Sequence, residues 1–233
     1  MRKISILMVS VLCMMMPVGA EAQVPTAFVS KGTTDIQAQP HTITQTSSGA
    51  QWAPIDLMVR SITMDDGLPS NAVRSVVQGS KGYMWFGTDN GLCRFDGYDV
   101  KTYYNPFTTV DQFVSALTAC EEGLLVGCNN GAYLFCNATD RFQKLSDKIT
   151  APVLNFSLDG DQNVWISTSG QGVFRYNRTT HELHQYPMKN IQGKVKSTLV
   201  DANNQVWMLC NQGEASIYHL NKSTDQFEAF PLK

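Results

Sequence analysis

The side chains that could carry out acid–base or nucleophilic chemistry are few in this chain, and they form no recognisable set. A hydrolase needs paired carboxylates, or a nucleophile with a base beside it, and histidine is the usual base near neutral pH. The four histidines are His41, His181, His184 and His219. None of them stands in a catalytic motif, so the sequence predicts no catalytic residues and a protein that is not an enzyme.

One run of oxygen-bearing side chains, Asp159–Asn163, begins as a calcium-binding loop does. The sixth position is Val164 rather than glycine, and Gly170 stands where the bidentate glutamate should be, which excludes an EF-hand. The segment Asp201–Asn204 has the same place in a later repeat. We interpret both segments as turns between strands, and the sequence predicts neither a metal site nor a cofactor.

Aromatic side chains could instead bind a sugar ring by stacking. Trp85, Trp165 and Trp207 recur at one place in a repeat of the chain, and such regularity favours packing between repeats. Aromatic residues that break the repeat are better candidates for ligand contact. These are Tyr103, Tyr104, Phe107 and His184. The sequence alone does not decide among them, so the ligand-binding residues stay unassigned here.

The cysteines fit neither a zinc site nor a disulfide framework. Without Cys13, which lies in the leader described below, five remain: Cys93, Cys120, Cys128, Cys136 and Cys210. An odd number means that at least one thiol has no partner within the chain, and the spacings match no zinc pattern. Cys128 and Cys210 fill the slot that holds Thr88 and Thr168 in other repeats, so we expect small buried side chains there.

The charge of the chain argues against two classes of partner. Only 16% of its 233 residues are charged, and the formal net charge is -2. No basic stripe exists to neutralise phosphates, so nucleic acid and acidic membrane surfaces are not expected partners. The hydrophobic content of 43% is enough for a packed core.

A fourfold repeat determines the expected architecture. The slot of Trp85 returns as Leu125, Trp165 and Trp207, in steps of 40, 40 and 42 residues. A period near 40 is typical of a four-stranded propeller blade. The repeats consist of short segments rich in β-branched and aromatic residues, separated by Gly, Asn and Asp clusters. We therefore predict an all-β fold, a β-propeller of four-stranded antiparallel blades, with about four blades present.

Each repeat divides into four expected strands. They are Val73–Gln78, Tyr83–Thr88, Leu92–Phe95 and Val100–Tyr104; Val114–Cys120, Leu124–Cys128, Ala132–Cys136 and Phe142–Leu145; Val153–Leu158, Val164–Thr168, Val173–Tyr176 and Leu183–Tyr186; Val195–Val200, Val206–Cys210, Ala215–Leu220 and Phe227–Phe230. One hairpin of each repeat carries a glycine, where a positive φ would favour that residue. These glycines are Gly91, Gly131, Gly172 and Gly213.

The amino-terminal region differs from the repeats in its amino-acid composition. Residues 1–22 show the basic start, apolar run and small-residue cleavage site of a secretory signal peptide. A retained anchor is the alternative, although the apolar run is short for a membrane span, and no other segment could cross a membrane. Residues 23–54 read as a flexible lead-in. Residues 55–233 hold the blades, at about 64–106, 107–147, 148–188 and 189–233.

A further segment, Leu57–Thr63, resembles a strand that could close a ring by completing the last blade. The fourth repeat already carries its own outer strand, so this early strand has no incomplete blade to join. A closed ring of four blades is rare, and an open arc would expose the apolar faces of its first and last blades. The sequence therefore favours an incomplete ring, in which this chain is the amino-terminal part of a longer protein or a truncated product of one.

Two stretches carry a family resemblance. The segment Thr63–Val76, with Gly67-Leu68-Pro69, and the segment Lys81–Tyr98, with Trp85-Phe86-Gly87-Thr88 and Gly91-Leu92, closely resemble the opening of the two-component regulator propeller family. The match is close over residues 60–104 and in the third repeat. It is looser in the second, where Leu125 replaces the usual Trp, and in the fourth, where Cys210–Glu214 departs from the pattern.

The resemblance implies an extracytoplasmic sensor segment of a hybrid two-component regulator, exported to the periplasm of a Gram-negative bacterium. Its implied ligand is an oligosaccharide, and its implied partners are further propeller blades or a second copy of the chain. The kinase of such proteins is not expected within this sequence. Two alternatives remain: a free-standing secreted binding or scaffold protein that self-associates, and, as the weakest, a propeller lyase or glycosidase.

Overall fold

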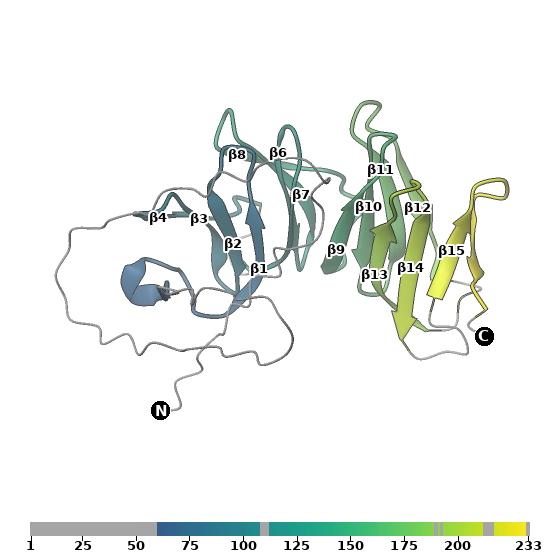
Figure 1. Cartoon of the computed structure of the whole chain (residues 1–233), viewed down its shortest axis with the longest axis horizontal. Helices are drawn as coiled ribbons and strands as arrows, with labels where there is room; N and C mark the ends of the chain where they lie inside the picture. Colours follow the sequence, from purple (N-terminus) through teal and green to yellow (C-terminus); the bar gives the residue numbers. More distant parts are fainter. Residues whose placement is uncertain (1–59, 108–111, 189–190, 192, 212–216, 232–233) are drawn as a thin grey trace, which may run out of the picture. The chain divides into compact units, whose positions relative to one another are not determined.

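The computed structural model describes residues 60–107, 112–188, 191, 193–211 and 217–231, and these form four antiparallel four-stranded sheets (Figure 1). We call the sheets blades 1 to 4. Blade 1 contains β1 (Val73–Gln78), β2 (Met84–Thr88), β3 (Gly91–Phe95) and β4 (Val100–Tyr103). Blade 2 contains β5 (Val114–Ala119), β6 (Gly123–Cys128), β7 (Gly131–Cys136) and β8 (Arg141–Lys144). Blade 3 contains β9 (Val153–Leu158), β10 (Asn163–Thr168), β11 (Gly172–Asn177) and β12 (Leu183–Tyr186). Blade 4 contains β13 (Lys194–Val200), β14 (Val206–Asn211), β15 (Ile217–Asn221) and β16 (Gln226–Ala229).

The strand order within each blade follows the chain, as the repeat predicted. The observed strands agree with the expected ones to within a residue or two at their ends. In the part of the chain that the structure describes, no helix is long and apolar enough to span a membrane. The signal-peptide and lead-in predictions fall on residues outside the described ranges, as does Gly213.

An irregularity that the sequence pattern did not reveal recurs in the first strand of every blade. The pairing of first and second strands skips one residue at Arg74, Ser115, Leu154 and Lys196. A bulge of this kind bends a strand and increases its twist. Its repetition at one position shows that the four blades share backbone geometry as well as strand order.

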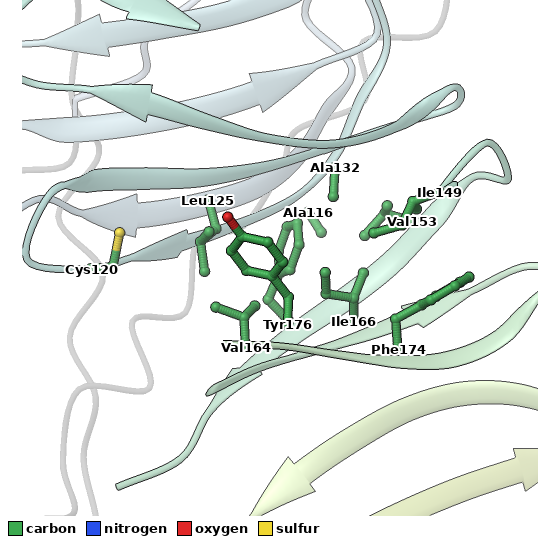
Figure 2. Close-up of a cluster of buried hydrophobic side chains, with 11 residues drawn as sticks. Ala116, Cys120, Leu125, Ala132, Ile149, Val153, Val164, Ile166, Phe174 and Tyr176 are labelled. Carbon is green, nitrogen blue, oxygen red and sulfur yellow. The ribbon is translucent and has the colours of Figure 1, made fainter. Parts of the chain in front are cut away.

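The hydrophobic core lies between consecutive blades rather than within one of them. Each blade has a leading face, toward the preceding blade, and a trailing face, toward the next. Between blades 2 and 3, Leu125 and Ala132 of the trailing face meet Val153, Ile166 and other residues of the leading face (Figure 2). Similar clusters join blade 1 to blade 2 and blade 3 to blade 4. Within the described residues, the sheets are stacked in sequence and do not close into a ring.

Backbone hydrogen bonds to short side chains fix the register between first strands. The backbone N–H of Leu117 donates to Ser75 Oγ at 3.0 Å, across the joint of blades 1 and 2. In the joint of blades 3 and 4, the N–H of Thr198 donates to Asn155 Oδ1 at 3.0 Å. Ser75 and Asn155 occupy the same place in their blades. The first strands therefore pack in the same geometry at the joint of blades 1 and 2 and at that of blades 3 and 4.

Blade 1 begins with a cap instead of the strand expected over Leu57–Thr63. Of that segment the described part, residues 60–63, is not a strand, because Thr63 starts a short 3-10 helix, η1 (Met64–Asp66). Thr63 Oγ1 accepts from the N–H of Asp65, and the Asp66 carboxylate accepts from the N–H of Thr63 at 2.8 Å. This capping box ends the extended backbone. Downstream, Leu68 is buried against Phe86 on the leading face of blade 1.

No disulfide forms among the cysteines of the described residues, and the environments of these thiols differ. Burial raises the pKa of the Cys93 thiol to about 12 and that of Cys120 to about 11. Cys136, at the end of β7, is only half-buried, and a hydrogen bond with the Thr139 side chain lowers its pKa. Since the thiolate is the reactive form, Cys136 should react faster than Cys93 and Cys120.

We therefore expect iodoacetamide at pH 8 to modify Cys136 well before Cys93 and Cys120 in the folded chain, as measured by peptide mass spectrometry over time. Cys136→Ser should leave the slow modification of those two sites unchanged. Equal rates at Cys136 and Cys93 in folded protein would contradict this ranking.

Candidate functional site

The antiparallel topology divides the polar residues between two ends of the sheets. One end carries the hairpins between first and second strands and between third and fourth strands; we call it the hairpin end. The other carries the hairpins between second and third strands and the connections from one blade to the next, and we call it the loop end. Connections of this kind, placed by a rigid scaffold, commonly carry binding residues.

At the hairpin end, the carboxylates that resembled a calcium loop are occupied by hydrogen bonds. Asp159 accepts from the N–H groups of Asp161 and Asn163, at 2.8 and 2.9 Å. Its second oxygen accepts from Asn163 Nδ2 at 2.9 Å and from Trp165 Nε1 at 2.8 Å. These bonds hold a turn, as the sequence analysis proposed. Among the described residues, no group of three or more His, Cys, Asp or Glu side chains could hold a metal ion.

Asp201 repeats this arrangement in blade 4. Its carboxylate accepts from the N–H groups of Asn203 and Gln205, and from Trp207 Nε1 at 2.9 Å. The bond from Trp207 is the largest cause of the lowered pKa of Asp201. An aspartate six residues before the repeated tryptophan thus orients the indole ring, which is a structural role.

Two aspartates connect neighbouring blades at the hairpin end. Asp140, in the β7–β8 hairpin, accepts from Lys101 Nζ at 2.9 Å and from Tyr103 Oη at 3.3 Å, both in blade 1. The hydrogen bond from Lys101 is the main reason that the pKa of Asp140 is lowered. Asp225, in the β15–β16 hairpin, similarly accepts from Tyr186 Oη at 2.6 Å and from Arg175 Nη1 at 3.2 Å, both in blade 3.

The joint between blades 2 and 3 is built differently. The hairpin residue of blade 3 at the place of Asp140 is His181, which has a positive φ of 60° and contacts Tyr176 Oη within its own blade. The charged contact across this joint runs from Arg178 Nη1 to Glu122 Oε2, at 2.9 Å. Here the base belongs to the later blade and the acid to the earlier one.

A shallow groove beside the joint of blades 3 and 4 is the main polar recess near the predicted residue His184. Its lining residues are Asn163, Arg175, Asn177, Glu182, Leu183 and His184. Arg175 is held by Asp225, and Asn177 Nδ2 by Asn163 Oδ1 at 2.9 Å. His184 packs edge-on against Tyr186. Since no Tyr, Phe or Trp ring lines this groove, it is the weaker candidate for binding a ligand by ring stacking.

Residues 105–107, which follow β4 at the loop end, present an aromatic ring on a backbone held by hydrogen bonds. The N–H of Asn105 donates to Gln112 Oε1 at 2.6 Å, and Gln112 Nε2 donates back to the Asn105 carbonyl at 3.1 Å. The Asn105 side chain, itself buried, accepts from the N–H of Phe107 at 2.9 Å. The Phe107 ring stacks on Tyr133, with centroids 5.6 Å apart and planes within 17°. Phe107 is nevertheless 53% exposed, so its outer face is available.

Tyr104 and a charged pair lie at the same end. Tyr104 is 58% exposed, and its ring borders the backbone at Gly91 in the β2–β3 hairpin. In that hairpin Asp89 accepts two hydrogen bonds from Arg74, at 2.6 and 2.9 Å, and these bonds lower its pKa. We call Tyr104, Phe107 and the Arg74–Asp89 pair the loop-end surface. It combines exposed aromatic rings with oriented polar groups, as a saccharide requires.

The residues singled out from the sequence separate into two groups. Tyr104 and Phe107 are exposed at the loop end, whereas Tyr103 is buried in the joint of blades 1 and 2, and His184 belongs to the joint of blades 3 and 4. The packing role expected for the tryptophans is confirmed for Trp85 and Trp165, which are each 2% exposed. Trp207 differs because no blade covers its face among the described residues.

The comparisons with known proteins bear on this fold. Residues 67–90 match the two component regulator propeller. The matched segment runs from Gly67, which ends η1, to the β2–β3 hairpin. It lies within residues 60–104, where the sequence closely resembles this family, and the match confirms that resemblance. A comparison with curated proteins finds no match.

Solved structures share the propeller architecture. The extracellular domain of a Bacteroides protein (B. thetaiotaomicron), assigned as a hybrid two component system, superposes with a TM-score of 0.62 at 20% identity, over 72% of this chain and 22% of that one. A second such domain from the same organism gives 0.63 at 16%, over 74% and 26%. Virginiamycin B lyase from Staphylococcus aureus gives 0.59 at 14%, over 70% and 57%. The present chain thus spans about a quarter of the length of the first two, and the superpositions establish the β-propeller fold.

Sequence reasoning missed the contacts that join the blades. Asp140 and Asp225 looked like ordinary hairpin residues, since an aspartate is common in any turn. A signal was nevertheless present: each follows a Tyr or a basic residue of the preceding repeat at a distance of about one period. Residue pairs separated by one period are the ones that can meet across a joint of a repeat protein.

Proposed function

We propose that this chain is the extracytoplasmic ligand-sensing segment of a two-component signal-transduction protein, and that its loop-end surface binds an oligosaccharide. The match of residues 67–90 to the two component regulator propeller supports the signalling role. The signal-peptide pattern of residues 1–22 supports export to the periplasm. The observation that carries the ligand class is the pair of exposed rings, Tyr104 and Phe107, on a connection fixed by Gln112.

The chemistry of the loop-end surface suits a neutral sugar. The C–H face of a pyranose ring is apolar and packs on an aromatic face, while its hydroxyl groups need donors and acceptors at the rim. Phe107 is held parallel to Tyr133, so little ring entropy is lost when a ligand stacks on it. Arg74 and Asp89 hold each other in fixed orientations beside the hairpin that Tyr104 borders. Bound sugar would then bridge two connected blades and alter the geometry passed to the rest of the protein.

We expect Tyr104→Ala and Phe107→Ala each to weaken binding of a recognised oligosaccharide about tenfold, the usual size of a lost aromatic contact at a binding hot spot. The measurement is isothermal titration calorimetry of the full chain against a panel of neutral oligosaccharides. Tyr98→Ala is the matched control, because Tyr98 is 65% exposed but lies in the β3–β4 hairpin, at the opposite end. Equal weakening by all three substitutions, or no binding across the panel, would reject the loop-end surface as a saccharide site.

The signalling role has an independent test in the gene. The reading frame that follows Lys233 should encode further blades, a membrane helix and a histidine kinase. A stop codon there with no such segments would favour the alternative of a free-standing secreted protein that self-associates. That alternative would have to use the exposed face of blade 4.

A further inference from the structure

The tryptophan of blade 1 lacks a hydrogen bond that its two counterparts make. Trp165 Nε1 and Trp207 Nε1 each donate to an aspartate six residues earlier in the chain, at 2.8 and 2.9 Å. Trp85 is only 2% exposed, and no described residue accepts a hydrogen bond from its Nε1. A buried indole N–H usually has a partner, because leaving it without one is costly. The N–H of Trp85 therefore needs an acceptor that the described chain does not supply.

The missing acceptor corresponds to the side chain at position 79. The N–H of Gly79 donates to the Tyr83 carbonyl at 2.9 Å, and Asp159 and Asp201 make the same backbone bond in their own hairpins. Gly79 thus has the place of these aspartates. A Cβ added to Gly79 would lie 2.7 Å from Trp85 Nε1, which is too close. An aspartate does not fit here without a shift of the backbone, so the acceptor has to come from another molecule.

A second donor beside Trp85 also lacks an acceptor. Arg94 lies opposite Trp85 in the strand register. Its counterpart opposite Trp165 in blade 3 is Arg175, which donates to Asp225 of the next blade at 3.2 Å. No described residue accepts a hydrogen bond from Arg94. Blade 3 thus supplies a carboxylate to each of these two donors, and blade 1 supplies neither.

The charge around the two donors favours an anion. They line a small recess at the hairpin end together with Gly79, Lys81, Tyr83, Asn137 and Asp140. Asp140 is the one acid of this lining, and its carboxylate already accepts from Lys101 Nζ at 2.9 Å. Lys81 has no ion pair with any described residue. The lining therefore carries two positive charges, those of Lys81 and Arg94, without a counter-charge.

The size of the recess limits the group that can enter it. Its volume is about 10 Å³, close to the space that a single water molecule needs. A flat carboxylate can place one oxygen inside and keep the other at the opening. A guanidinium also matches the planar geometry of a carboxylate better than that of other anions of similar charge. The recess is therefore suited to a small carboxylate.

We propose that this recess binds a small monocarboxylate, such as acetate or formate, in the role that an aspartate has in blades 3 and 4. One oxygen accepts from Trp85 Nε1 and the other from the guanidinium of Arg94. Trp85 packs against Tyr103 of its own blade and Phe135 of blade 2, so the bound anion stabilises the joint of blades 1 and 2. The recess lies at the hairpin end, so this site is separate from the loop-end surface.

Nuclear magnetic resonance of the indole N–H groups tests the proposal in the full chain. The protein is labelled with ¹⁵N-tryptophan and titrated with sodium acetate at pH 7, with sodium chloride keeping the ionic strength constant. Trp85→Phe, Trp165→Phe and Trp207→Phe assign the three signals. We expect the signal of Trp85 to move and to saturate with a millimolar Kd, as so small a ligand allows. The signals of Trp165 and Trp207 should stay in place, because these groups already donate to aspartates.

A substitution in each of two blades shows whether the guanidinium beside Trp85 takes part. Arg94→Gln should weaken acetate binding about tenfold, because it removes a charge-assisted hydrogen bond. Arg175→Gln is the matched control, since Arg175 has the same register position in blade 3 and donates to Asp225 instead. It should leave the response of Trp85 to acetate unchanged. Circular dichroism checks that both variants are folded.

Three results would overturn the proposal. A Trp85 signal that does not saturate with acetate would show that the recess holds water alone. Equal saturation by sulfate at the same ionic strength would show that the recess does not select a carboxylate. Equal weakening by Arg94→Gln and Arg175→Gln would place the acetate site elsewhere. All three are measured without sugar, so they leave the test of the loop-end surface separate.

Discussion

Trp165→Ala is expected to lower the free energy of unfolding by about 3–5 kcal/mol, the usual cost of removing a fully buried tryptophan. Trp165 is 2% exposed and packs against Tyr186 and Phe227 in the joint of blades 3 and 4. Its Nε1 donates to the Asp159 side chain at 2.8 Å, so the substitution also removes this hydrogen bond. Urea denaturation followed by circular dichroism measures the loss.

Trp207→Ala is the matched control for this prediction. Trp207 has the same strand position and the equivalent bond to an aspartate, Asp201, at 2.9 Å. It lies on the uncovered face of blade 4, so its truncation creates no closed cavity, and we expect about half the cost or less. Equal costs for the two substitutions would mean that the face of blade 4 is covered in solution.

Gly131→Ala is the second substitution with a large expected effect. Gly131 starts β7 with a φ of +134°, which costs any residue with a side chain about 1–3 kcal/mol. An added Cβ would also lie 2.5 Å from the carbonyl oxygen of Ile149, and this oxygen is backbone that cannot turn aside. The two penalties together should exceed about 3 kcal/mol and displace the connection between β8 and β9.

Gly170→Ala separates the two penalties. Gly170 has a φ of +107°, but nothing lies within 4 Å of an added Cβ. We therefore expect it to cost only the conformational part, about 1–2 kcal/mol, in the same urea titration. If Gly131→Ala proved no more destabilising than Gly170→Ala, the approach of Ile149 would not be a constraint on this hairpin.

The strands of this protein could be predicted from its sequence because the alternation of hydrophobic residues, the turn residues and the repeat length all indicate the same strand boundaries. The hairpin glycines are a case in point: Gly91, Gly131 and Gly172 have positive φ, as predicted. The early strand was wrong over its described part, residues 60–63, since the capping box of Thr63 and Asp66 starts a 3-10 helix there. Strand propensity is a weak signal where a local cap competes with it.

The candidate site was predicted only in part. Exposure decides whether an aromatic residue can meet a ligand, and two adjacent residues, Tyr103 and Tyr104, differ in it completely. Alternation along a strand places them on opposite sides, but the pattern alone does not tell which side a neighbouring blade covers. The need for glycine at positions 87 and 127 could not be predicted from the sequence either. It arises because Val114 and Val153 of the following blades lie so close that a Cβ at either glycine would collide with them.

The charged contacts at the hairpin end also bear on how a chain of similar blades assembles in the correct order. Repeated sheets with interchangeable faces risk misassembly during folding. Blade 2 offers the acidic Asp140 to Lys101 of blade 1, whereas blade 3 offers the basic Arg178 to Glu122 of blade 2. If blade 3 folded against blade 1 by mistake, Arg178 would approach the β1–β2 hairpin, which carries Lys81 where the β5–β6 hairpin carries Glu121 and Glu122, and like charges disfavour such a pairing. The charge at the joint of blades 2 and 3 therefore disfavours one particular mispairing, in which blade 3 would pack on blade 1 and leave blade 2 out.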